Sequence, residues 1–525
     1  MSALRFFAAA LAAAALAGVP AQAAPARVFR YASQIDPGTM DPHALASLYH
    51  TRVISQIYEP LVGRDERFAL EPRLALSWSM VDNGHAWRFK LRQGVKFQDG
   101  TPFTADDVVF SVERSLAKTS QQRATYPNVT GARKVDDSTV DILTSQPTPV
   151  LPRALTNSRM MSRKWCIEHH VEKPLDFNAK EETYASRNAN GTGPFMLKSW
   201  EPDVKTVLEA NPGYWGRHGN LTEADFLVVA QAATRLAGLI SGELDFVVDA
   251  GVQDIDRLRK TPGMTVSMSE GLGANYLGFD YSREKLLYGE AGGKNPFRDI
   301  RVRQAIRYGL DLKAIQSKVM RNLSSVGSAI FTPVVDGWDK RFEKIYPYDP
   351  DKAKALLAEA GYPNGFSVVL DCSSQAPADA VCQAVAGMLA RVGIKVDFQP
   401  RTFNVLLPKV LTRDTSFYAI GWTPASADAE GVLLPLVHSA TGPGVGEYNF
   451  GRYSNPKVDA LIDSARVEMD EAKRRSMLTE AMTIMDADSG YIPILYRKIV
   501  WVMRANVKAN AQPNDIVDLR FVNVQ

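Results

Sequence analysis

The residue types that carry out catalysis do not form a recognisable catalytic motif in this chain. The sequence contains no Gly-x-Ser-x-Gly nucleophile motif and no Cys-x-x-Cys pair. The run from Gly289 to Lys294 is one residue too short for a phosphate-binding loop, and Asn295 follows it in place of Ser or Thr. We therefore expect no enzyme of these classes and no bound cofactor.

Histidine spacing gives only weak support for a metal site. His169 and His170 are adjacent, and adjacent residues of a helix or a strand do not share a face, so we expect a solvated pair. His43 and His50 lie seven residues apart, a spacing that places both on one face of a helix. A transition-metal site at His43 and His50 is one alternative, but our prediction is that the chain has no metal site.

The three cysteines divide into a close pair and a single residue. Cys372 follows a strand-like segment at 366–370, and Cys382 lies on the helix expected next. The pair forms either a local disulfide or two free buried thiols. Cys166 is left over, and only Lys164 beside it could activate a thiol.

The N-terminus and the composition indicate an exported globular protein. Residues 1–23 combine one arginine, an apolar run to about residue 18 and small residues at 21–23, which is typical of a cleavable signal sequence. No cysteine near the cleavage site could carry a lipid anchor, so we expect a soluble periplasmic protein. The 525 residues are 45% hydrophobic and carry a net charge of +3, which gives no support for nucleic-acid binding.

Local patterns define the elements of the segment after residue 58. Apolar and basic residues alternate at 87–92, with the period of a half-buried strand. Asp99-Gly100 is a tight-turn dipeptide. Thr104, followed by Asp106 and Asp107, is typical of a helix N-cap with acidic residues in the first turn.

Similar patterns continue along the chain. Asp299 and Asp349 are placed as helix N-caps, and Pro350 fits a first helical position. Two β-α-β units are expected, at 226–230, 232–241 and 244–248, and at 366–370, 378–392 and 395–399.

The order of these segments resembles the family 5 extracellular solute-binding proteins, the peptide- and nickel-type receptors of ABC importers. The resemblance covers essentially the whole mature chain. It rests on Tyr-Glu-Pro-Leu-Val at 58–62, the segment 87–109, Gly-Thr-Gly-Pro-Phe at 191–195, Asn-Pro-Gly-Tyr-Trp at 211–215 and the segment 296–306.

This resemblance implies a two-lobed α/β fold of the type II periplasmic binding protein kind. The first lobe would take residues 24–268, with an extra subdomain inserted at about 60–190. The second lobe would take residues 269–498, and residues 499–525 would return to the first. Crossing segments near 265–272 and 497–501 would form the hinge.

The resemblance also places a ligand site between the lobes, beside the loop 421–428. Relatives that bind peptides hold the peptide amine with an aspartate three residues after the loop tryptophan. Here Ala425 stands at that position after Trp422, and the first acid is Asp428. Asp428 is either a substitute ligand contact or a cap for the next helix, and Trp422 is either a cleft wall or a core residue.

Further candidates come from segments that line the cleft in relatives. Ser373, Ser374 and Gln375 replace the Arg and Tyr of dipeptide binders and suit hydrogen bonding to amides or hydroxyls, unless they form an exposed turn. Arg401 is a conceivable replacement for the missing carboxylate clamp. The remaining candidates, each of which could instead be packed in the core, are Tyr49, His50, Asn275, Tyr276 and His438.

The function implied is the capture of a short peptide or peptide-like solute by a monomeric periplasmic receptor, which delivers it to an inner-membrane ABC permease. The departures at Ala425 and at 372–375 keep open a non-peptide ligand, such as an opine, a sugar derivative or a metal chelate. An exported hydrolase is the alternative among enzymes. A receptor that reports to a membrane sensor is the alternative to import.

Overall fold

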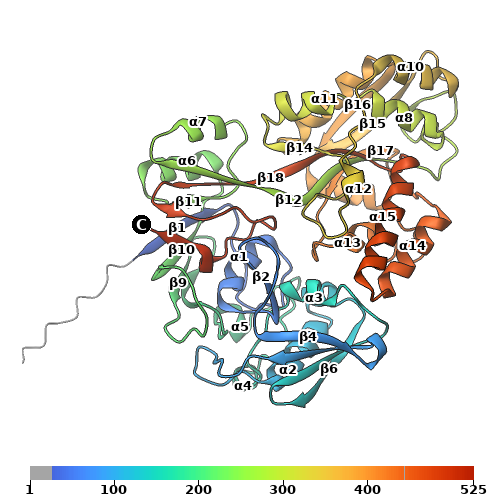
Figure 1. Ribbon diagram of the computed structural model, residues 1–525. Coiled ribbons are helices and arrows are strands. Elements are labelled where there is room, and N and C mark those ends of the chain that lie inside the picture. The colour runs from blue at the N-terminus through green and yellow to red at the C-terminus, as the bar shows by residue number, and fades with distance from the viewer. Residues whose placement is uncertain (1–26, 443) are drawn as a thin grey trace, which may run out of the picture.

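One twelve-stranded sheet runs through both lobes of the molecule (Figure 1). The computed structural model describes residues 27–442 and 444–525, so the expected signal sequence at 1–23 lies outside the described residues. The strand order is β13-β15-β17-β12-β18-β11-β1-β10-β9-β8, with β14 beside β18 and β16 beside β15. Within the described part of the chain, no helix is long and apolar enough to cross a membrane.

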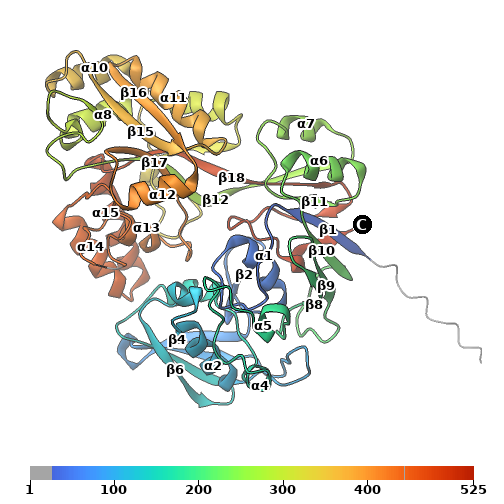
Figure 2. The same ribbon diagram turned by 180° about the vertical axis from the view of Figure 1, so that it is seen from behind.

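Two long strands, β12 (Met264–Phe279) and β18 (Ile492–Arg504), connect the lobes (Figures 1 and 2). They pair antiparallel from Met264 opposite Arg504 to Leu277 opposite Ile492. The crossing segments expected near 265–272 and 497–501 lie within these two strands. The predicted boundaries at 268 and 498 thus fall inside continuous strands.

The β12–β18 ladder is interrupted between Glu270 and Ala274. Gly271 lies in this interruption, and a Cβ atom there would be 2.8 Å from the carbonyl oxygen of Arg497. The backbones approach so closely only because residue 271 has no side chain.

The first lobe surrounds the strand β1, which pairs in parallel with both β10 and β11. Helix α6 connects β10 to β11, so the predicted β-α-β unit is confirmed, with β1 inserted between its strands. The elements of this lobe are β1 (Val28–Ser33), α1 (Leu48–Ile57), β2 (Val62–Arg64), β3 (Leu70–Pro72), α5 (Tyr184–Arg187), β8 (Phe195–Glu201), β9 (Lys205–Ala210), β10 (Glu223–Val228), α6 (Ala232–Ser241), β11 (Phe246–Val247), α7 (Ile255–Lys260), β19 (Val507–Lys508) and β20 (Asn523–Val524).

A separate four-stranded sheet, in the order β4-β5-β7-β6, lies between β3 and α5 in the sequence. Its apolar core draws on residues between Leu61 and Met160 and is distinct from the cores of the rest of the first lobe. Its elements and the helices that follow it are β4 (Ala75–Val81), β5 (Ala86–Leu91), α2 (Ala105–Leu116), β6 (Val129–Asp136), β7 (Thr139–Thr144), α3 (Leu151–Ala154) and α4 (Arg163–Glu168).

The second lobe contains the parallel pair β15 and β16, joined by α11 as predicted. Two large apolar clusters fill it, one on each side of the β12–β17 strands. Its elements are β13 (Gly289–Glu290), α8 (Ile300–Tyr308), α9 (Leu312–Ala314), β14 (Ser324–Val326), α10 (Pro350–Glu359), β15 (Phe366–Ser373), α11 (Ala378–Ala390), β16 (Ile394–Arg401), α12 (Phe403–Leu411), β17 (Phe417–Trp422), α13 (Glu430–Leu436), α14 (Pro456–Val467) and α15 (Glu471–Ala487).

The helix starts follow from their capping residues. Thr104 and Asp107 form a reciprocal capping box at the start of α2. Asp299 accepts a hydrogen bond from the Arg301 amide at the start of α8, and Asp349 accepts one from the Lys352 amide at the start of α10. All three predicted N-caps are confirmed.

Candidate ligand-binding cleft

A cavity of about 760 Å³ lies between the two lobes, beside the strands that connect them. Such a volume is in the range of small-molecule sites in proteins. First-lobe, hinge and second-lobe residues all contribute to its wall, so a bound molecule would contact both lobes. The wall draws on the segments 46–54, 122–125, 157–159, 271–276, 372–382, 419–425, 494–499 and 513–516.

Trp422, at the end of β17, lies in this wall. Its Nε1 donates a hydrogen bond to the carbonyl oxygen of Gly431 at 2.8 Å, and its ring packs on Tyr448 with centroids 4.9 Å apart. The side chain is only half-buried. Trp422 therefore braces the loop, and its half-buried ring also forms part of the cleft wall.

Asn275 and Tyr276 are also brought to the wall, on β12. The Tyr276 side chain is 1% exposed and packs on Tyr491 with ring centroids 5.2 Å apart. Burial raises the pKa of Tyr276 far above its ordinary value. Tyr276 is thus chiefly a core residue, whereas the half-buried Asn275 retains an amide that can face a ligand.

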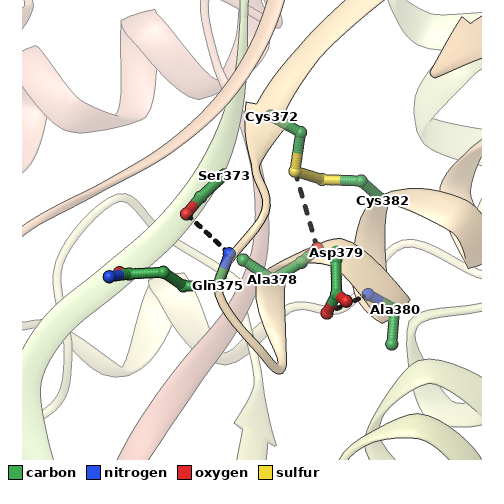
Figure 3. The surroundings of a disulfide bond; sticks show 7 residues. All are labelled: Cys372, Ser373, Gln375, Ala378, Asp379, Ala380 and Cys382. Atoms are coloured by element: carbon green, nitrogen blue, oxygen red, sulfur yellow. Dashed lines mark hydrogen bonds between the residues drawn. A yellow bond between two sulfur atoms is a disulfide. The ribbon is translucent and has the colours of Figure 1, made fainter. Parts of the chain in front are cut away.

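A disulfide joins Cys372 at the end of β15 to Cys382 on α11 (Figure 3). This confirms the bridged alternative, and both cysteines lie in the cleft wall. Ser373 and Gln375, which lie in the turn between the two cysteines, also line the cleft. The Ser373 hydroxyl accepts a hydrogen bond from the backbone amide of Gln375 at 3.2 Å (Figure 3). Ser374 does not line it. The disulfide thereby fixes the turn that presents two polar side chains.

The remaining cysteine, Cys166, is buried in the first lobe. Burial raises the pKa of its thiol to about 12, so the thiolate is not accessible at neutral pH.

Asp428 is placed outside the cleft wall and is completely buried. Arg474 binds both of its carboxylate oxygens, at 2.9 and 2.7 Å, and the Glu430 amide donates to it at 2.9 Å. The Asp428 carboxylate is therefore paired with Arg474 within the protein, and it accepts a hydrogen bond from the first backbone amide of α13. Ala425, at the position of the missing amine-binding aspartate, does line the cleft.

The other candidates from the sequence are not brought to the cleft. The Tyr49 hydroxyl pairs with Gln34, and His438 pairs with Asp463 at 3.3 Å. Arg401 does not replace the missing clamp, because its Nε donates to Asp371 at 2.7 Å.

His43 and His50 do not lie on one helix face, as a metal site between them would require. Helix α1 begins at Leu48, so His43 precedes it and the two rings do not share a helix face. Burial lowers the pKa of both His43 and His50 to about 4. No group of three or more metal-ligating side chains occurs in residues 27–442 and 444–525.

Three charged residues line the cleft, and the sequence had singled out none of them. They are Arg159, Arg497 and Asp515. The Asp515 carboxylate is already occupied by Arg52 at 2.6 Å and by the Trp501 indole at 2.8 Å. Arg159 is 6% exposed and lies in the loop after α3. No sequence pattern distinguishes it from the nearby surface arginines.

Comparisons with known proteins agree with this architecture. The family model described as "Bacterial extracellular solute-binding proteins, family 5 Middle" matches residues 69–444. The chain is 29% identical to heme-binding protein A of Haemophilus influenzae, over 84% of this chain and 82% of that protein. It is 27% identical to the glutathione-binding protein GsiB of Escherichia coli K12, over 88% of this chain and 87% of that protein.

Solved structures show the same fold. The periplasmic binding protein DppA of Helicobacter pylori, in complex with the peptide STSA, superposes with a TM-score of 0.73 at 24% identity, over 95% of this chain and 98% of that one. With the family model spanning most of the described residues, the chain belongs to the family 5 bacterial extracellular solute-binding proteins.

Proposed function

We propose that this protein is the periplasmic receptor of an ABC importer and captures a short peptide or peptide-like solute between its lobes. The observation that carries the proposal is the cleft of about 760 Å³ with walls from both lobes. A ligand that contacts both lobes favours the state in which they are close together. The receptor acts as a monomer without a membrane anchor and delivers its ligand to a separate permease.

The character of the wall supports an amide-rich ligand with apolar side chains. Trp422 and Leu272 offer apolar surface, while Ser373, Asn275 and Gln375 offer hydroxyl and amide groups. A few polar groups on a largely apolar wall fix the orientation of a ligand without requiring a particular side chain.

The lobes already touch on one side of the cleft. The side-chain amide of Asn157 donates a hydrogen bond to the Ala425 carbonyl oxygen at 3.0 Å. The Arg64 guanidinium donates one to the Ser426 carbonyl oxygen at 3.1 Å. The Phe68 side chain packs into a second-lobe core cluster. We infer that lobe closure about β12 and β18 forms these contacts, and that they hold the closed state that the permease recognises.

A non-peptide solute is the second candidate, because Asp428 is bound to Arg474. A buried peptide ammonium requires a charged partner, and the one carboxylate in the cleft wall, Asp515, already pairs with Arg52. Membership of a solute-binding family supports binding of the ligand without breakage of a bond.

The test is native mass spectrometry of the mature protein purified from its own periplasm without denaturation. We expect co-purified peptides of several masses. A single non-peptide mass would favour the second candidate. Cleavage products of added peptides would contradict a binding function.

A further inference from the structure

An ionic cluster joins the two lobes outside the cleft wall. Arg153, on α3 of the first lobe, pairs with Asp336 and, at 3.1 Å, with Glu471. Both acids belong to the second lobe, where Asp336 lies between β14 and α10 and Glu471 is the first residue of α15. The residues that line the cleft do not include these three. The cluster therefore ties the lobes together at a place that a solute in the cleft does not touch.

The Asp336 carboxylate is shared between the lobes. Its Oδ2 pairs with Arg153 of the first lobe, and its Oδ1 accepts a hydrogen bond from Arg475 of the second lobe at 2.6 Å. The side chains of Arg153 and Asp336 are only 21% and 22% exposed, so water and salt screen this pair less than a fully exposed one. When the lobes separate, Asp336 keeps Arg475 and Arg153 is hydrated. The pair can therefore break and re-form without leaving a buried charge unpaired.

Asp336 is also fixed to the loop 421–428, which carries Trp422. The backbone amide of Asp336 donates to the Ala427 carbonyl oxygen at 2.9 Å, and its carbonyl oxygen accepts from the Ala429 amide at 2.8 Å. Trp422, at the other end of this loop, lines the cleft. A solute contact at Trp422 and the ionic cluster thus act on the same loop.

Salt can reach the cluster through a neighbouring cavity. This cavity has a volume of about 350 Å³, and Arg153, Asp336 and Arg475 line it together with Phe68 of the first lobe. The screening length of an electrolyte falls from about 30 Å at 10 mM salt to about 3 Å at 1 M. The attraction between Arg153 and the two acids should therefore weaken as salt is added.

We propose that Arg153, Asp336 and Glu471 form an ionic latch, which favours the closed arrangement of the lobes and raises the affinity for the solute without contacting it. This inference rests on the proposed function, because it concerns how strongly the receptor holds its solute. A contact made only in the closed state biases the equilibrium toward the state that the solute also prefers. The latch makes solute capture depend on ionic strength, whatever the chemistry of the solute.

The first test needs no solute. Small-angle X-ray scattering gives the radius of gyration of the mature protein, dialysed free of solute, at 10 mM and at 1 M NaCl. At 10 mM NaCl we expect a larger radius for Arg153→Gln than for the wild type, and at 1 M NaCl the two should converge. Glu471→Gln should give a smaller shift, because Arg153 keeps its pair with Asp336.

The second test measures retention of a randomised tripeptide mixture, quantified by mass spectrometry after gel filtration. At 10 mM NaCl, Arg153→Gln should bind the peptides about threefold to tenfold more weakly than the wild type, and the ratio should approach one at 1 M NaCl. Its unfolding midpoint should stay close to that of the wild type, since Asp336 keeps Arg475.

Arg133→Gln is the matched control. Arg133 is a first-lobe arginine that also pairs with two carboxylates, Asp82 and Asp141, but both of these lie in its own subdomain. We expect the radius of gyration and the peptide retention of this variant to equal those of the wild type at both salt concentrations.

The outcomes separate the two proposals. If Arg153→Gln matches the wild type in both radius and retention, or if its defect persists unchanged at 1 M NaCl, the latch is overturned and the solute-binding function stands. An equal defect in Arg133→Gln also overturns the latch. Retention of no peptide by any of the proteins contradicts peptide capture, and the scattering alone then decides whether the latch exists.

Discussion

Arg474 binds both carboxylate oxygens of Asp428 in the interior of the second lobe, at 2.9 and 2.7 Å. Glu430 accepts a third hydrogen bond from the same guanidinium at 2.8 Å. An incoming ammonium would have to displace this arginine to reach Asp428. The acid that follows the loop tryptophan is therefore part of the scaffold of the second lobe.

Asp428→Asn should destabilise the protein with little effect on ligand affinity. Loss of one partner of a buried ion pair costs about 3 kcal/mol or more, here reduced by the remaining Glu430 contact. The urea midpoint of unfolding measures this loss. A double variant, Asp428→Asn with Arg474→Met, should recover part of it. Loss of ligand binding with unchanged stability would show instead that Asp428 contacts the ligand.

Trp422→Ala should weaken ligand binding about tenfold or more, since a rigid aromatic wall is lost from the cleft. Trp422→Phe, which retains an aromatic ring but loses the hydrogen bond to Gly431, should bind nearly as well as the wild type. Titration calorimetry with the ligand recovered from the periplasm makes the comparison. An alanine variant that binds normally would show that Trp422 only braces the loop.

Oxidised protein unfolded without reductant should show one free thiol per chain, that of Cys166, and three after reduction. Replacing Cys372 and Cys382 with serine together should cost about 2–3 kcal/mol of unfolding free energy, as expected for a short closed loop. Thiol titration and urea denaturation give the two values. Three free thiols in the oxidised protein would contradict the bridge.

Stability should fall as the pH is lowered from about 6.5 to about 4. The folded-state pKa of His43 and of His50 is lowered to about 4, so in this range the unfolded chain binds more protons than the folded one. Each histidine contributes a slope of up to about 1.4 kcal/mol per pH unit.

His50→Met should reduce this slope, because it removes one of the two buried imidazoles whose pKa is lowered. Urea midpoints at several pH values between 4 and 7 test the effect. Identical slopes in wild type and variant would show that His50 is accessible to protons in the folded state.

Residues that interact with close neighbours in the sequence predicted several elements of the fold. The capping residues Thr104, Asp299 and Asp349 act on neighbouring backbone amides, so sequence alone identified their helices. The Cys372–Cys382 bridge spans one turn and was also foreseeable as an alternative. The two crossing segments were expected from the resemblance, but their continuation as paired strands of 16 and 13 residues was not, because the pairing joins residues more than 200 positions apart.

The site was less predictable, because burial and distant partners decide which charges remain free. Trp422 was found through its loop. Asp428 could not be excluded, since its partner Arg474 lies 46 positions away in the sequence. Arg159 was missed for a different reason: only the fold shows which of several nearby arginines lines the cleft.

The most direct test of a solute site between the lobes is a crystal structure of the protein with its periplasmic ligand retained. We predict ligand density in the cleft, in contact with Trp422 from the second lobe and with first-lobe wall residues such as Asn157. Ligand density outside the cleft, or contacts with only one lobe, would contradict the account.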